Sequence, residues 1–299
     1  MKIGFLTCPG THPGSPIRRP DAFEHDLQVD AIRPELAKLG HELVEIDWHS
    51  PVEAFAALPL VQIGTVWDYQ DAEPEFLAKL DALETAGHIL CNSAAVVRWN
   101  SRKTYLRELA ESGAATIPTL WIDEPSSTDV ETAMAQFGSD TIVAKRQVGA
   151  GAEGQSIHRK AALDPDWRME HPAMLQPFLP QIQSDGEYSF LFVDGAFSHV
   201  LRKLPATGDY RVQTLYGGLE ESLEPTPEDR TAAQAIVDAL PFDAPLYARI
   251  DMVRSDQGGL LLMEAELIEP FLYPRQGPQL GAMIAAAIDR RLQTTTLTA

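Results

Sequence analysis

Three carboxylates near the end of the chain stand where an apolar core can least easily accommodate them. Asp251 interrupts the apolar run 246–253, and Glu264 and Glu266 close the run that begins at Leu260. The polar turn SDQGG between the two runs is typical of a β-hairpin. Residues two apart on a strand point to one face, so Glu264 and Glu266 project together and Asp251 can join them across the hairpin. The hairpin therefore predicts a cluster of three carboxylates.

Such a cluster has two explanations. Unpaired carboxylates beside a core repel each other and lose hydration. A divalent cation that prefers oxygen ligands, such as Mg²⁺, would relieve both costs. Ion pairs with Arg249 and Arg254, or hydration of the strand ends, would relieve them as well. Spacing alone leaves the metal site and the salt bridges open as alternatives.

Size, charge and cysteine usage limit the class of protein. The chain has 299 residues, enough for two or three packed units, and a formal net charge of −19, which argues against nonspecific nucleic-acid binding. Cys8 and Cys91 each end an apolar run and look like reduced thiols. The N-terminus is too short for a signal-peptide core, and no apolar run reaches the ~18 residues of a membrane span. We expect a cytoplasmic protein; a homodimer is compatible with the sequence.

Residues 1–95 alternate predicted strands and helices, which indicates a parallel sheet covered by helices. Ligands of such sheets bind beyond the carboxyl ends of the strands. The loops at these ends are candidate substrate walls, and their polar residues are Thr11, His12, Ser15, Arg18 and Asn92.

The middle of the chain carries two lysines and a glycine loop. The pattern from Asn92 to Gly113 predicts one helical segment that includes Lys103, and TIVAK predicts a strand that ends at Lys145. The loop that follows contains Gly149, Gly151 and Gly154, a literal G-x-G-x-x-G. A dinucleotide fingerprint requires a helix after the loop, whereas a strand follows here, so we reject that interpretation. We favour a flap whose backbone N–H groups close over phosphates, rather than a plain hairpin turn.

The last third of the chain adds further polar groups. Glu187 begins a strand that turns at Asp194-Gly195 into a second strand bearing Arg202 and Lys203, which is a clear hairpin pattern. Arg211 follows. Separated lysines and an arginine suit a polyanion, and a carboxylate trio suits metal ions that bridge its phosphates.

This order of residues resembles the ATP-grasp ligases, the family of D-alanine–D-alanine ligase and glutathione synthetase, over nearly the whole chain. The most specific part is Arg249-Ile-Asp251 followed by Glu264-Ala-Glu266. The resemblance implies an α/β protein of three units: an N-terminal parallel α/β substrate domain (1–95), a small central lid domain (96–180) and a C-terminal, mainly antiparallel α+β catalytic domain (181–299). The family usually has Asn where Glu266 stands, so the number or affinity of bound metal ions can differ.

The resemblance also implies roles for individual residues. Lys103 and Lys145 would contact the ATP phosphates, and Glu187 would hold the ribose hydroxyls. Arg211 would bind the γ-phosphate or the acyl phosphate, and Arg249 would stabilise charge at the reacting carbonyl. The remaining positions are the lid glycines, the backbone groups of the adenine hinge and the Mg²⁺ ligands: Gly149, Gly151, Gly154; Gln176, Phe178, Leu179; Asp251, Glu264, Glu266.

The implied chemistry converts ATP and a carboxylate into an acyl phosphate, which a nitrogen nucleophile captures. The segment LLLMEAELIEPFLYP resembles a branch that includes the ATP-dependent cyclo-ligase of cycloserine biosynthesis, which closes a ring in O-ureido-D-serine. Residues 9–18 and 270–276 would hold a small amino-acid substrate, and Arg275 is either a carboxylate ligand or a surface residue.

Three alternatives remain at this point. In the first, the chain is a ligase that joins two molecules by an amide bond instead of closing a ring. In the second, it is an ATP-binding regulatory protein that has lost turnover. In the third, it is an unrelated α/β binding protein that does not bind ATP.

Overall fold

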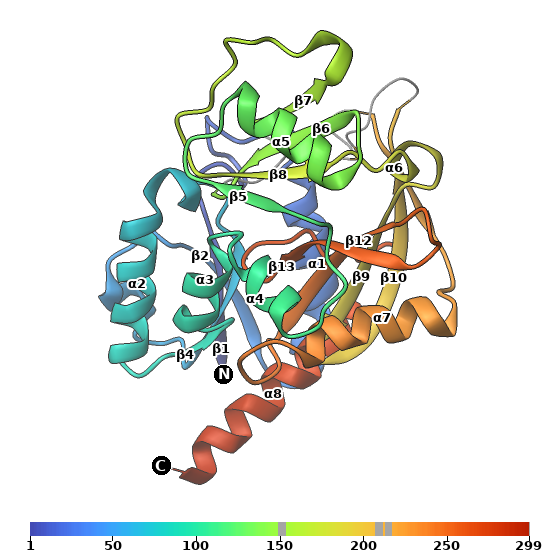
Figure 1. Cartoon of the computed structure of the whole chain (residues 1–299). Helices are drawn as coiled ribbons and strands as arrows, with labels where there is room; N and C mark the ends of the chain where they lie inside the picture. Colours follow the sequence, from blue (N-terminus) through green and yellow to red (C-terminus); the bar gives the residue numbers. More distant parts are fainter. Residues whose placement is uncertain (149–153, 207–211, 213–216, 299) are drawn as a thin grey trace.

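Three sheets organise the computed structural model, which describes residues 1–148, 154–206, 212 and 217–298 (Figure 1). The first has strand order β2-β1-β3-β4, and all its pairings are parallel. Apolar residues fill β1 and β3 because helices cover both faces of the sheet. The predicted parallel sheet is therefore confirmed. Its elements are β1 (Lys2–Thr7), α1 (Phe23–Lys38), β2 (Glu42–Asp47), β3 (Leu60–Thr65), α2 (Glu73–Thr85) and β4 (Ile89–Cys91).

Two short helices follow, where the sequence predicted one helical segment. The prediction was wrong because residues 101–104 leave the helical path, and the backbone N–H of Lys103 donates to Gln147 O at 2.8 Å. The break places Lys103 two residues before the second helix, beside the central sheet. The helices are α3 (Ala94–Asn100) and α4 (Tyr105–Glu111).

The central sheet is antiparallel, with order β5-β8-β6-β7. Helix α5 packs one face through Val130, Ala133 and Met134, all buried. Ser126 and Asp129 form a capping box at the start of this helix. The elements are β5 (Leu120–Ile122), α5 (Ser127–Phe137), β6 (Thr141–Arg146), β7 (Gln155–Arg159) and β8 (Ala173–Pro177).

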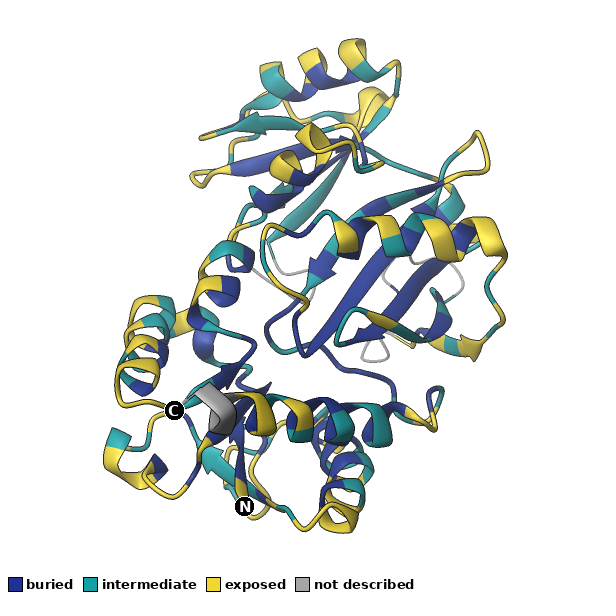
Figure 2. Cartoon of the chain, turned by 90° about the horizontal axis from the view of Figure 1, so that it is seen from below, coloured by how far each residue is buried: buried dark blue, intermediate teal, exposed yellow. Residues whose placement is uncertain are grey.

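The C-terminal sheet is also antiparallel, with order β11-β10-β9-β12-β13. It contains the two predicted hairpins, and helices α4 and α7 pack against one of its faces. Viewed from below, the strands are buried and the helices turn their exposed residues outward (Figure 2). The elements are α6 (Gln181–Ser184), β9 (Glu187–Val193), β10 (Ala196–Leu204), β11 (Leu219–Ser222), α7 (Pro227–Asp238), β12 (Tyr247–Arg254), β13 (Leu260–Glu266) and α8 (Leu280–Thr298).

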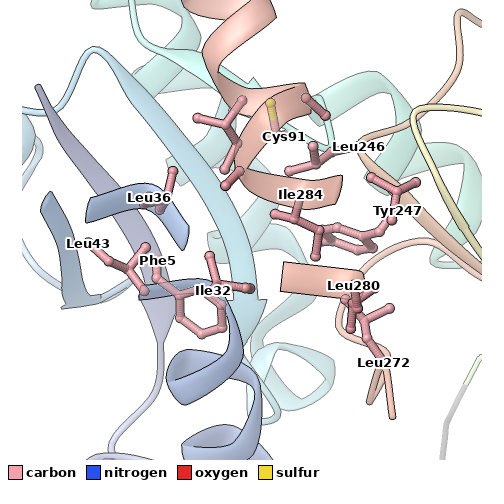
Figure 3. Packing of buried hydrophobic residues seen from close by; sticks show 14 of the residues in the cluster. Phe5, Ile32, Leu36, Leu43, Cys91, Leu246, Tyr247, Leu272, Leu280 and Ile284 are labelled. Carbon is pink, nitrogen blue, oxygen red and sulfur yellow. The ribbon is translucent and has the colours of Figure 1, made fainter. Parts of the chain in front are cut away.

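Helix α8 joins the first and last sheets in one hydrophobic core (Figure 3). Ile284 of α8 packs in the same cluster as Phe5 of β1 and Leu246 before β12. Helices α1 and α8 approach so closely that a Cβ on Gly281 would lie 1.9 Å from Ala31 O. The N-terminal and C-terminal sheets are therefore packed as one unit. No helix among the described residues has the length and apolar character that a membrane crossing requires.

Candidate active site

The hairpin of β12 and β13 places the predicted carboxylates opposite each other. In its register Asp251 faces Glu264 and Arg249 faces Glu266. Arg249 is 7% exposed, and its guanidinium donates to Asp251 at 2.9 and 3.0 Å, to Glu266 and to Phe271 O at 3.2 Å. Arg249 thus holds two of the three predicted carboxylates, Asp251 and Glu266, whereas Glu264 pairs with Lys103.

Burial and neighbouring charges shift the pKa values of these carboxyl groups. Burial raises the pKa of Glu266 to about 8 against the attraction of Arg249, and repulsion from Glu264 and Asp251 adds to the rise. Burial opposes the ionisation of Asp251, but Arg249 and Lys203 lower its pKa. Arg254, the other predicted partner, binds Asp185 and Asp229 instead. Among the described residues, no three Asp, Glu, His or Cys side chains converge as a ready-made metal site.

Lys203 is a site residue that sequence reasoning missed. It is 4% exposed, forms an ion pair with Glu187, and its Nζ lies 3.6 Å from Asp251. Burial works to lower the pKa of Lys203, but attraction by Asp251 and Glu187 raises it. Ser189 also donates to Asp251. The strand alternation that singled out the carboxylates applies to Lys203 as well, since its partner in the hairpin register is Glu187.

Tyr273 is a second residue that the sequence did not reveal. Its ring centroid lies 5.7 Å from Arg249 and 5.9 Å from the Lys203 ammonium, within the range of cation–π attraction. Its backbone has φ of 49°, a left-handed conformation that is uncommon for a bulky residue. Such strain persists where surrounding contacts hold it, often at functional sites.

Lys145, near the end of β6 in the central sheet, and Lys103, just before α4, lie beside Glu264. Lys103 forms an ion pair with Glu264. Burial lowers the pKa of Lys145, with Glu264 opposing the shift and Lys103 adding to it. The structure therefore brings the two predicted lysines together beside Glu264, at the junction of the central and C-terminal sheets.

The predicted hinge residues follow the end of β8. Gln176 is buried, and its side-chain amide donates to Thr119 Oγ1 at 2.9 Å. The backbone N–H of Phe178 donates to Thr141 O at 2.9 Å, so this donor is already used. Phe178 and Leu179 contribute to an apolar cluster together with Leu261 and Met263 of β13.

The glycine loop and one arginine lie partly beyond the described residues. Gly149, Gly151 and Arg211 fall outside them. Gly154 is described, and its φ of 69° requires glycine just before β7.

On the substrate side, two predicted wall residues proved to be structural. The buried Thr11 hydroxyl lies 3.1 Å from Cys8 O and 3.4 Å from Thr65 O, so one of these carbonyls accepts its hydrogen bond. Asn92 donates to Leu267 O at 2.6 Å and to Tyr247 O at 3.1 Å, which ties β4 to the C-terminal sheet. Both side chains are therefore used in joining elements of the fold. Arg275 is exposed.

Two family models match parts of the chain. Residues 3–92 match the N-terminal domain of D-cycloserine synthetase DcsG, and residues 162–265 match the ATP-grasp domain of prokaryotic glutathione synthetase. The crystal structure of D-cycloserine synthetase DcsG superposes with a TM-score of 0.81 at 22% identity and covers 98% of this chain and 100% of that one. The chain is an ATP-grasp ligase.

Other proteins similar to this chain are also ATP-dependent ligases or their relatives. The cycloserine biosynthesis protein DcsG of Streptomyces lavendulae is 27% identical, and the match covers 89% of the ligase and 96% of that protein. A glutathione synthetase of Pseudomonas syringae pv. tomato is 27% identical over 72% of the ligase and 67% of its own length. D-alanine–D-alanine ligase of Bacillus anthracis, solved with ATP, superposes with a TM-score of 0.68 at 15% identity and covers 100% of both chains.

Proposed function

We propose that the ligase activates the carboxylate of a small amino acid as an acyl phosphate and then closes a ring within that molecule, with O-ureido-D-serine as the substrate and D-cycloserine as the product. The supporting observation is the match of residues 3–92 to the N-terminal domain of D-cycloserine synthetase. These residues form the parallel sheet whose carboxyl-end loops are the expected place for the substrate. The match to glutathione synthetase falls instead on residues 162–265.

The charged residues have complementary roles in this proposal. Lys103, Lys145 and Lys203 bind and orient the ATP phosphates, and Arg249 faces the carbonyl at which negative charge develops. Fixed cations in a buried site stabilise such charge without reorganisation. We keep Arg211 and the lid glycines Gly149, Gly151 and Gly154 as phosphate contacts on the basis of the family resemblance.

Asp251, Glu264 and Glu266 would hold Mg²⁺, since carboxylate oxygens are its preferred ligands. When bound, the ion neutralises phosphate charge. Lys103 pairs with Glu264 in the structure. Phosphates that attract Lys103 would release this carboxylate for the metal ion.

The remaining assignments complete the proposal. Glu187 binds the ribose, and Gln176, Phe178 and Leu179 border the adenine through their backbone groups. The domains span residues 1–95, 96–180 and 181–299, with the central domain acting as the lid. The enzyme works in the cytoplasm, where ATP is available.

A second candidate is an intermolecular amide ligase, which the match to glutathione synthetase favours. Measuring ADP formation with a panel of amino acids, including O-ureido-D-serine, separates the two. Stimulation by one amino acid alone supports ring closure, whereas a requirement for two substrates together would replace it by the intermolecular reaction. Binding of ATP without any turnover would instead indicate the regulatory protein.

A further inference from the structure

Glu269 lies where the chain passes from the C-terminal sheet to the N-terminal domain. It follows the end of β13 by three residues, and its neighbour Ile268 packs in the core beneath the parallel sheet. The hydroxyl of Tyr247 fixes this backbone by donating to Ile268 O at 2.8 Å. Glu269 Oε1 accepts a hydrogen bond of 3.3 Å from Gln70 Nε2 of the N-terminal domain. The carboxylate is therefore held on a rigid segment at the junction of two domains.

The pair of Glu269 and Gln70 has unused acceptors. Within the part of the chain that the structure describes, the Glu269 carboxylate accepts hydrogen bonds from Gln70 Nε2 and from its own backbone N–H, and Gln70 Oε1 has no hydrogen-bond partner. Burial raises the pKa of Glu269 to about 7, and the nearby Glu264 adds to the rise. The Gln70 side-chain oxygen is one free acceptor, and the Glu269 carboxylate has lone pairs beyond the two hydrogen bonds that it accepts. A nearby positive charge would also stabilise the ionised carboxylate. These groups suit a cationic donor of several hydrogen bonds, such as an ammonium group.

Arg249 provides the opposite charge in the same region. It attracts Glu269 electrostatically, yet among the described residues its ion-pair partners are Asp251 and Glu266. A free amino acid carries a carboxylate and an ammonium group a few bonds apart. Arg249 and Glu269 therefore present charges complementary to the two ends of such a molecule.

We propose that Glu269 and Gln70 bind the α-ammonium group of the substrate and so make the ligase specific for free amino acids. This inference rests on the proposed function, because that function places the substrate carboxylate beside Arg249. The two side chains come from different domains, so the ammonium site is formed at their junction. Glu269 acts as a specificity-determining residue, separate from the groups that bind ATP.

Glu269→Gln tests the proposal, because it removes the charge and keeps the shape. The two substrates are the amino acid that supports ADP formation and its des-amino counterpart, in which hydrogen replaces the α-amino group. We expect kcat/KM for the amino acid to fall about 10- to 100-fold, mainly through KM, as a charge-assisted hydrogen bond is lost. The value for the des-amino compound and the KM for ATP should not change. Glu269→Asp should recover part of the loss, and Glu75→Gln on the exposed side of α2 is the matched charge control.

Two results would overturn the inference alone. In the first, Glu269→Gln lowers kcat/KM by the same factor for both compounds, which would show that Glu269 merely joins the domains. In the second, the wild-type enzyme uses both compounds equally well, which would show that it does not recognise the α-ammonium group. Absence of ADP formation with every amino acid of the panel would overturn the proposed function and this inference together.

Discussion

Replacing Lys203 by methionine tests whether its ion pair with Glu187 organises the buried site. The two side chains are only 5% and 8% exposed, and Asp251 is 3.6 Å from the ammonium. Methionine keeps the length of the side chain but removes its charge. Loss of one partner of a buried pair costs about 3–5 kcal/mol, because the remaining charge stays desolvated. We expect the free energy of unfolding to fall by about this amount near pH 8.

The carboxyl group left behind gives this loss a defined pH dependence. Burial raises the pKa of Glu187 in the wild type against the attraction of Lys203, so removing Lys203 raises it further. A carboxyl whose folded pKa is raised binds its proton more tightly when folded, and stability falls as pH rises above its unfolded pKa. The additional slope is at most about 1.4 kcal/mol per pH unit, and it begins above about pH 4.3. The variant should therefore be closer to the wild type at pH 5.5 than at pH 8.

Urea unfolding at pH 5.5 and pH 8, followed by tryptophan fluorescence, measures both effects. The set comprises the wild type, Lys203→Met, Glu187→Gln and the double variant. The double variant should regain much of the stability at pH 8, since neither buried charge remains. A loss in Lys203→Met that is the same at both pH values, or a double variant no more stable than Lys203→Met, would refute this account of the pair.

Three further predictions concern other parts of the molecule. Glu264→Gln should abolish Mg²⁺-dependent ADP formation, while thermal unfolding shows the fold retained; unchanged turnover would remove Glu264 from the metal site. Gly281→Ala should lower the stability by about 1–3 kcal/mol through overpacking of the α1–α8 contact, whereas Gly259→Ala, with nothing within 4 Å of its Cβ, should be nearly neutral in the same thermal measurement. Cys91, whose pKa burial raises to about 11, should resist a disulfide reagent at pH 8 until the protein unfolds, and rapid labelling of the native protein would contradict its burial.

Local patterns predicted most elements of the fold and the hairpin register that puts Asp251 opposite Glu264. Alternation along two strands placed Asp251, Glu264 and Glu266 on one face of the hairpin, because period-two geometry does not depend on distant parts of the chain. The parallel sheet followed from the order of strands and helices in the same way. Strand periodicity could not predict whether the carboxylates pair with Arg249 or with Arg254. The choice of partner depends on which side chains the rest of the molecule brings near each arginine.

Lys203 shows why the remaining part of the site escaped prediction. Arg202 and Lys203 are adjacent on β10, so one faces inward and the other outward. Which one faces inward depends on the register, and β10 has an irregularity between Phe197 and His199. One extra residue in a strand exchanges the two faces. Tyr273 was missed for a related reason, because its contacts arise from a loop conformation that no sequence pattern marked.

The core shared by helix α8 and the parallel sheet has a consequence for biosynthesis. The first 95 residues leave the ribosome early, but Leu280 and Ile284 of α8, which complete the cluster around Phe5, are made much later. Domains that are complete in sequence can fold as they are synthesised, whereas this sheet has to wait for helix α8. The nascent N-terminal segment is therefore expected to stay open to chaperones and proteases until α8 has been synthesised.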